Sequence, residues 1–440
     1  MRSRKGVEKG YVSRWWVILA AVVMFIGSPA VCVSASVAKQ EAAAQADDTA
    51  GTSRVEIAPL ERETAPGRYI VRMEKRRQAA KRGRTRLAAE RAFAEAERLE
   101  NQQRADSRRQ AVVKYEEAAR LYRALGERGK EAECLCKAGT LSLVLGDALK
   151  ALEYYTQALA LSRAVGDRAK EAMALNSIGQ VYYVLGENQK ALEYFTQTLA
   201  IHRAVGDQDG EATMLNYIGR VYSDLGEKQK ALEYYTQALV LFRDVGNREW
   251  VAETHLEIGR VYADLGETQK ALGHFITAKV LYAVMRNRMG EALTLLGIGR
   301  MYKDLGEKQK ALDAYTEARN LLRGYREYRD LEALTLLTIG RVYADLGKHR
   351  EALEYYTEAL ALFRIVEDRA MEAEMLNAIG AVYEALGDKQ KAWEYYNQAR
   401  DIIVSTSIFS RDLDRHGGNR HNIAEPVRDR RTPHINRRVR

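Results

Sequence analysis

Proline is almost absent from this chain. Only five of its 440 residues are proline, and none lies between Pro66 and Pro426. Proline removes a backbone donor and interrupts helices, and turns rich in proline and glycine separate the strands of sheet proteins. The long stretch without proline therefore indicates unbroken helices and disfavours a fold built from strands and turns.

Motifs for catalysis are absent as well. The sequence has no Gly-rich phosphate loop, no HExxH metal motif and no nucleophile elbow. Among its seven histidines, His202, His255 and His349 are interpreted as substitutions within a repeated pattern. The Glu-Tyr-Tyr runs, such as residues 153–155, recur at packing positions, which favours a structural role over acid–base chemistry. The sequence predicts a protein that is not an enzyme, with no catalytic residues, no metal site and no cofactor.

Cysteine is scarce, with three residues in the chain. Cys134 and Cys136 are two positions apart on a predicted helix, so their side chains point to nearly opposite sides. They cannot easily form a disulfide with each other or share a metal ion. We interpret both as small residues in a helix interface.

What the chain has in abundance is one repeated segment, represented by residues 172–207. The dipeptide Leu-Gly marks its copies, with steps of 40, 40, 40, 40, 41 and 40 residues between successive glycines. These glycines are Gly146, Gly186, Gly226, Gly266, Gly306, Gly347 and Gly387. A period of this size is typical of a solenoid, in which each unit buries its apolar face against the next.

Each repeat contains two helical patterns. In the first half, apolar residues such as Leu175 and Ile178 recur at steps of three and four, on one face of a helix. Gly186 ends this helix, because glycine tolerates the left-handed conformation of a helix C-terminus. The second half repeats the spacing around Phe195, and Asp207 is expected to cap the helix that follows. Each unit is therefore predicted to be an antiparallel helix pair.

These residues carry a family resemblance. The run Leu175, Ile178, Gly179, Tyr182, Ala191, Phe195 and Thr198 resembles the tetratricopeptide repeat, and other units carry the same positions. The resemblance covers residues 107–404 and implies an all-α fold, a right-handed α-solenoid of stacked antiparallel helix pairs. The family's usual unit has about 34 residues. This longer one is similar to the repeats of kinesin light chains, of LGN-type adaptors and of bacterial signalling proteins, which implies longer helices and a deeper groove.

The two ends of the array differ. Residues 107–128 align with a second helix, so the array opens on a half-unit whose missing first helix is supplied, if at all, by residues 87–105. Seven first helices and eight second helices are expected. After Val404 the period stops, and no polar capping helix is visible. Three explanations stay open: Ile408 and Phe409 fold back, the end is a docking surface for self-association, or the chain is the front part of a longer protein.

The net charge of +9 comes from the flanks of the array. Residues 68–91 hold ten Lys or Arg and two Glu, and residues 411–440 hold nine Arg and four acids. The array itself is not basic, so no nucleic-acid partner is predicted. Residues 36–106 are predicted to be a linker and a basic helical lead-in, which either contacts an anionic surface such as lipid headgroups or is simply solvated. Residues 405–440 are predicted to be a disordered tail.

The N-terminus has the features of a targeting signal. Basic residues precede an apolar core of 13 residues, Trp15–Gly27, and small residues at positions 33–35 offer a cleavage site. Residues 1–35 are therefore a signal peptide or an uncleaved membrane anchor, since the 24 residues from Trp15 to Ala38 carry no charge and could span a bilayer. Both alternatives place the repeats outside the cytoplasm, in a bacterial periplasm or at a cell surface.

The resemblance also implies a binding face. In the family, the first helix of each pair lines the concave side, and the positions just before and after the Ile-Gly pair face a bound peptide. The earlier position holds Asn176, Asn216 and Asn377, and the later position holds Gln180, Arg220, Arg260, Arg300 and Arg341. Asparagine can bond a peptide backbone and arginine can grip a carboxylate with two donors. The implied partner is a protein or extended peptide, acidic in character.

The arginines have a simpler explanation too. Asp224, Asp264, Asp304 and Asp345 lie four residues after the four arginines, and such intrahelical pairs contribute about 0.2–0.5 kcal/mol each. The leading hypothesis is a non-enzymatic scaffold that binds a partner in the groove. The alternative is the regulatory part of a CHAT-type, caspase-like protease, because similar bacterial repeats often precede such a domain. Only 36 residues follow Val404, so this chain does not carry the catalytic domain.

Overall fold

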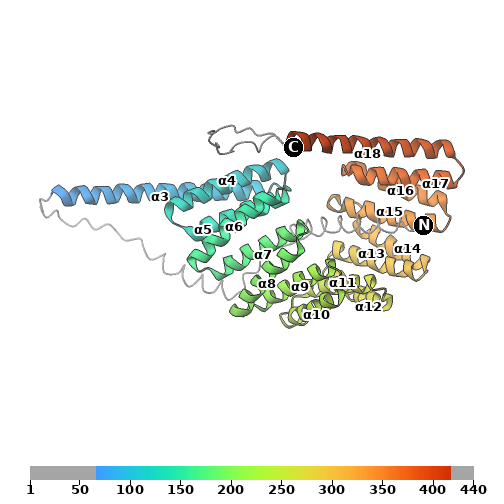
Figure 1. The fold of residues 1–440 in the computed structure, drawn as a ribbon, viewed down its shortest axis with the longest axis horizontal. Helices are drawn as coiled ribbons and strands as arrows, with labels where there is room; N and C mark the ends of the chain where they lie inside the picture. The colour runs from blue at the N-terminus through green and yellow to red at the C-terminus, as the bar shows by residue number, and fades with distance from the viewer. Residues whose placement is uncertain (1–65, 418–440) are drawn as a thin grey trace, which may run out of the picture. The chain divides into compact units, whose positions relative to one another are not determined.

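The computed structural model describes residues 66–417, and the side chains of residues 73–405. The predicted signal or anchor, the linker up to residue 65 and residues 418–440 of the predicted tail lie outside this range. The described residues contain helices and no strand, as predicted (Figure 1). None of these helices is both long enough and apolar enough to cross a membrane.

The helices fall into two compact units, one ending at Asn247 and the other beginning at Arg248. This division was not indicated by the even period of the sequence. The first unit contains α3 (Pro66–Glu100), α4 (Ala105–Leu125), α5 (Arg128–Val144), α6 (Ala148–Val165), α7 (Arg168–Val184), α8 (Asn188–Val205), α9 (Gln208–Asp224) and α10 (Lys228–Asp244).

The second unit contains the remaining helices. They are α11 (Arg248–Asp264), α12 (Thr268–Val284), α13 (Arg288–Asp304), α14 (Lys308–Leu322), the 3₁₀ turn η1 (Arg326–Tyr328), α15 (Arg329–Asp345), α16 (His349–Ile365), α17 (Arg369–Ala385) and α18 (Lys389–Gly417). In both units each helix packs against the next one along the chain. The fold class is the predicted all-α solenoid of helix pairs.

The turns between helices form as the sequence predicts. Gly186 adopts φ +76° after α7, and its N–H donates to the carbonyl of Tyr183 at 2.9 Å. Asp207 caps α9, because its Oδ1 accepts from the N–H of Gly210 at 3.1 Å. Glycine at the end and a capping carboxylate at the start satisfy backbone groups that a helix leaves unpaired.

The single step of 41 residues has a local cause. Helix α14 ends at Leu322, and Gly324 takes φ +85° before the 3₁₀ turn that leads into α15. The other complete units of the array pass from the second helix to the next first helix without such a turn. The extra residue is therefore accommodated in the connection between two helix pairs, and the repeat register resumes in α15.

A carboxylate clamps the turn between successive pairs. Glu171 at the start of α7 accepts from Arg163 at 2.8 Å and from Arg168 at 2.8 Å. The hydrogen bond from Arg163 lowers the pKa of Glu171 against the opposing effect of burial, and Arg168 lowers it further. Glu372 repeats the arrangement with Arg364 and Arg369 in the second unit. In each case the glutamate connects the end of one helix pair to the start of the next and stabilises the turn between them.

The core is a strip of recurring aromatic and small residues. The aromatic residue of each second helix lies against the glycine of the preceding first helix, and the rings of Tyr155, Phe195 and Tyr235 in the first unit and of Phe275, Tyr315 and Tyr356 in the second are buried. Each such ring contributes about 1.5–3 kcal/mol through burial. The Ile-Gly dipeptide of the repeat is thus explained by the close approach of an aromatic ring.

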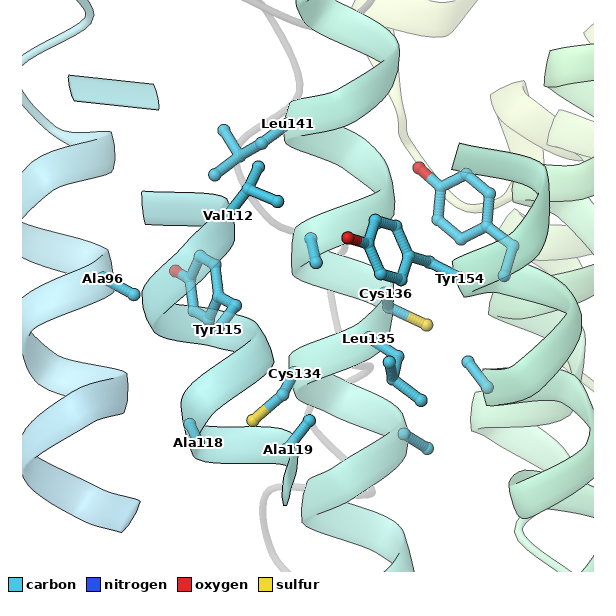
Figure 2. Packing of buried hydrophobic residues seen from close by; sticks show 14 of the residues in the cluster. Ala96, Val112, Tyr115, Ala118, Ala119, Cys134, Leu135, Cys136, Leu141 and Tyr154 are labelled. Carbon is cyan, nitrogen blue, oxygen red and sulfur yellow. The ribbon is translucent and has the colours of Figure 1, made fainter. Parts of the chain in front are cut away.

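The missing first helix of the opening half-unit is α3. It contributes Ala89, Ala92 and Ala96 to the same core as Tyr115 of α4 (Figure 2). Cys134 and Cys136 lie on opposite sides of α5, as predicted, and both are buried and free. Burial raises the pKa of both thiols to about 12, so they behave as small apolar residues.

The other end differs from the predicted boundary. Helix α18 continues to Gly417, past the boundary predicted at residue 404. No glycine or proline occurs between Gly387 and Gly417, so nothing in the sequence stops the helix earlier. Residues 405–417, which were predicted to belong to the disordered tail, thus lie in a helix, and the remainder of the predicted tail is outside the described residues.

Candidate partner-binding face

The predicted site residues lie on the first helices of the pairs, in both units. In the first unit α7 carries Asn176 and Gln180, and α9 carries Asn216 and Arg220. In the second unit α11, α13, α15 and α17 carry, in this order, Arg260, Arg300, Arg341 and Asn377. We call the second set the arginine face.

Two of the predicted residues are not available to a ligand. Asn216 is fully buried and Arg220 is only 7% exposed. The sequence could not show this, because the same repeat position is half-buried at Gln180 and exposed at Arg300. The candidate site of the first unit is thus reduced to Asn176 and Gln180.

Asn176 has an unusual environment for an amide. It is partly buried on α7, and its Oδ1 has no hydrogen-bond partner among the described residues. A buried acceptor left unpaired costs about 1–3 kcal/mol. Because this oxygen is itself buried, a ligand reaches it only if the side chain moves.

The arginine face is accessible and charge-balanced. The side chains of Arg260, Arg300 and Arg341 are 33%, 58% and 50% exposed. Arg260 donates to Glu257 at 2.9 Å, and Arg341 pairs with Glu374 of α17. Each of these cations therefore already has a carboxylate partner in the protein.

Arg300 shows how the first helices are connected. Its Nη2 lies 3.6 Å from Asp264 of α11, whereas its own-helix partner Asp304 lies at 4.0 Å. Lys303 of α13 pairs with Asp345 of α15 at 3.1 Å. The predicted pairing with the aspartate four residues on is thus the longer contact for Arg300, and Arg341 pairs across to α17 instead.

The ion pairs between neighbouring first helices have a geometric reason. On stacked helices, a long side chain on one first helix reaches the next first helix of the array, and the sequence pattern of one helix does not contain that distance. Glu374 and the Lys303–Asp345 pair were missed for the same reason. Glu257 is different, because it lies three residues before Arg260 on the same helix, a spacing that the sequence does show. Exposed ion pairs of this kind contribute about 0–1 kcal/mol, so a ligand carboxylate can replace the partner at low cost.

Two tyrosines beside the arginine face have raised pKa values. Burial raises the pKa of Tyr315, and raises that of Tyr356 to about 12, so both phenols stay protonated at neutral pH. No group of three or more potential metal ligands occurs among the residues that the structure describes. The arrangement offers exposed charges and amides, which are able to form hydrogen bonds and ion pairs with a polar ligand.

The comparison with protein families decides the identity of the repeats. The tetratricopeptide repeat model matches residues 170–244, 250–324 and 331–403, about half of the chain. The chain belongs to the tetratricopeptide repeat family. This family has a fold typical of protein–protein interaction scaffolds. A search of curated proteins found no match.

Solved structures with tetratricopeptide repeats resemble the chain in fold. A signal-transduction ATPase with numerous domains and a tetratricopeptide repeat sensor, from Pyrococcus horikoshii, is 14% identical with a TM-score of 0.52, over 71% of this chain and 54% of that one. The apo form of RapI is 18% identical with a TM-score of 0.48, over 62% of this chain and 99% of that one. A putative kinesin light chain from "Podosopora anserina" is 18% identical, with a TM-score of 0.38, over 43% of this chain and 93% of that one.

Proposed function

We propose that this protein is a non-enzymatic scaffold that binds an extended acidic segment of a partner protein along its first helices. The observation that carries the proposal is the exposure of Arg300 and Arg341 on consecutive first helices, where each side chain forms exposed ion pairs. A partner carboxylate can replace these weak contacts and gain two donors from one guanidinium. In the first unit, the partly buried side chains of Asn176 and Gln180 are the remaining candidates for contact with the partner.

The test neutralises the arginine face. Replacing Arg300 and Arg341 with glutamine should weaken binding of extended Glu-containing peptides at least about tenfold, or about 1.4 kcal/mol. Binding by the unaltered full chain should also weaken as salt rises, because exposed charges are screened. Fluorescence anisotropy with peptides that contain Glu, and with matched peptides that contain Gln, measures both effects.

A charge-matched control uses arginines elsewhere. Arg326 in η1 and Arg350 on α16 are exposed, and neither lies on a first helix. The variant Arg326→Gln/Arg350→Gln loses the same charge and should bind like the unaltered chain. Equal weakening in both double variants, or none in the Arg300/Arg341 variant, would contradict the proposal. Circular dichroism checks that helix content is unchanged.

Self-association through the end of the array is a second proposal. Trp393 on α18 is 67% exposed, while Leu312 at the equivalent position of α14 is 4% exposed. Ile403 is 53% exposed, while the equivalent Phe363 of α16 is 2% exposed. In the inner pairs these positions are covered by the next first helix, so α18 presents an uncovered apolar stripe, which a second copy of α18 could cover.

Light scattering tests this second proposal. The molar mass of the unaltered chain should rise with concentration, and Trp393→Glu/Ile403→Glu should abolish the rise. The single variant Ile276→Glu is the control, because Ile276 on α12 is similarly exposed at 49% but lies away from the end of the array. A concentration-independent monomer, or the same rise in the double variant, would reject association through α18.

We also propose that the repeats act outside the cytoplasm, on the strength of the basic residues and apolar core at the N-terminus. Cell fractionation with N-terminal sequencing should find the repeats in the exported or membrane-bound fraction. Recovery in the cytosol with an intact N-terminus would reject this localisation. The regulatory role beside a CHAT-type protease stays a sequence prediction.

A further inference from the structure

Two histidines meet inside the first pair of the second unit. His255 of α11 and His274 of α12 approach with their Nδ1 atoms 2.9 Å apart. His255 is only 6% exposed, and the ring of His274 stacks on Tyr262 at 5.6 Å between centroids. Burial on one side and stacking on the other hold the two rings facing each other.

This arrangement is specific to one repeat. The equivalents of His255 are leucines in the other units, among them Leu175, Leu215 and Leu295, all buried. The equivalents of His274 are mostly tyrosines, among them Tyr194, Tyr234 and Tyr355, and these tyrosines stack on the preceding helix. Both partners of the contact therefore change to histidine in the same pair.

The surroundings change as well. A pocket of about 300 Å³ is lined by His255, Tyr262, Lys270, Gly273, His274 and Thr277, all from α11 and α12. Gly273 stands where the other complete units have glutamate or aspartate, and Thr277 stands where they have glutamine or glutamate. Two larger side chains are thus replaced by smaller ones beside the histidines, which opens space next to them.

From this geometry we propose that His255 and His274 form a binding site for a divalent transition-metal ion of the Cu²⁺ or Ni²⁺ type. Two nitrogen ligands about 2.0 Å from a metal lie about 2.8 Å apart when they subtend 90°, and about 3.3 Å apart in a tetrahedron. The observed 2.9 Å separation matches the first of these distances, which belongs to the tetragonal geometry that Cu²⁺ and Ni²⁺ prefer. The ring centroids lie 5.1 Å apart, so without metal the two Nδ1 atoms point at each other, and both rings must turn toward the pocket when the ion binds.

The protons of the two histidines can be accommodated when the metal ion binds. Without metal, one Nδ1–H donates to the other Nδ1, so the two neutral rings are different tautomers. When the metal binds, the donor ring carries its proton on Nε2 instead, and both Nδ1 lone pairs face the metal. The neutral pair loses no proton in this step.

The rest of the coordination sphere is open. No third His, Cys, Asp or Glu completes a metal cluster with this pair within the described residues. The pocket therefore leaves room for water or for a donor from outside. Lys270 also lines the pocket, and its charge is balanced by its ion pair with Glu267. The site is independent of the arginine face and of its proposed partner.

The repeat itself supplies the variants for a test. His255→Leu and His274→Tyr introduce the residues that the other units carry at these positions, so both variants should fold. His349→Lys is the control, because lysine occurs at the equivalent Lys308 and Lys389. His416, His421 and His434 lie beyond the residues with described side chains, so all proteins carry asparagine at these three positions.

Isothermal titration of the full chain with CuCl₂ alone, and separately with NiCl₂ alone, measures the site. One ion should bind per chain, and either His255→Leu or His274→Tyr should weaken its binding by more than about 100-fold. Loss of a residue that only hydrogen-bonds to a metal ligand weakens metal binding by about 10- to 100-fold, and loss of a ligand itself should cost more. His349→Lys should bind as before, and the electron paramagnetic resonance spectrum of Cu²⁺ should show two nitrogen donors. No binding by the parent chain, or equal binding by His255→Leu/His274→Tyr, would overturn the proposal.

Discussion

Replacing Gly299 with valine should lower the free energy of unfolding by about 3 kcal/mol or more. A Cβ built on Gly299 of α13 would lie 2.3 Å from Cε1 of Tyr315 and 2.6 Å from its Cδ1. The ring is 2% exposed and has no room to move away. The substitution therefore forces α13 and α14 apart, and the urea midpoint measured by circular dichroism should fall.

A double-mutant cycle separates the clash from the effect of helix propensity. Gly299→Ala should be destabilising, whereas Gly83→Ala on α3 should be neutral or stabilising by up to about 1 kcal/mol, because nothing lies within 4 Å of its added Cβ. Tyr315→Leu should reduce the cost of Gly299→Ala, since the ring causes it. Additive effects of the two changes, or a Gly299→Val chain as stable as its parent, would show that Gly299 does not lie against the Tyr315 ring.

The Leu-Gly dipeptide shows what the sequence could predict. Its regular recurrence identified the repeat and its register, and the apolar spacing within each unit identified the helix pair, because a pattern copied through the array is independent of any one contact. The same copying predicted the turns at Gly186 and the cap at Asp207, and the structure confirms both. Local chemistry and period were sufficient for these features.

The arginine face shows where such reasoning stops. Each arginine was predicted to pair within its own helix, yet Arg341 pairs with Glu374 on another helix. Likewise, Asn216 is buried and Asn377 is exposed, although both occupy the same repeat position. Pairing and exposure depend on how successive helix pairs stack, and this information is not contained in the spacing within one helix.

The histidine pair is a different case. His255 was interpreted as a substitution within the repeat, and its partner His274 has no feature of its own in a single sequence window. The signal is a pair of departures from the repeat, 19 residues apart, that meet in space. Comparing the units with one another, position by position, would have identified both residues before the contact was known.

Replacing Tyr115 with alanine should cost about 3–5 kcal/mol and release α3 from the array. The Tyr115 ring is fully buried, packs edge-on against Phe93 of α3 with 5.4 Å between centroids, and its hydroxyl donates to Glu100 of α3 at 2.7 Å. From α3, three alanines and Leu99 share the core with this ring. Figure 2 shows Ala96 facing Tyr115.

Hydrogen exchange measures this release directly. Amides of residues 87–100 should lose protection in the Tyr115→Ala chain, while those of α13 and α14 should keep theirs, since stability in a repeat array depends on nearest neighbours. Tyr115→Phe keeps the ring and removes only a hydrogen bond to a charged acceptor, so it should cost about 1.5–3 kcal/mol and leave α3 protected. If α3 stays fully protected in the alanine variant, then Tyr115 does not hold α3 in place, and the helix must be retained by contacts along the rest of its length.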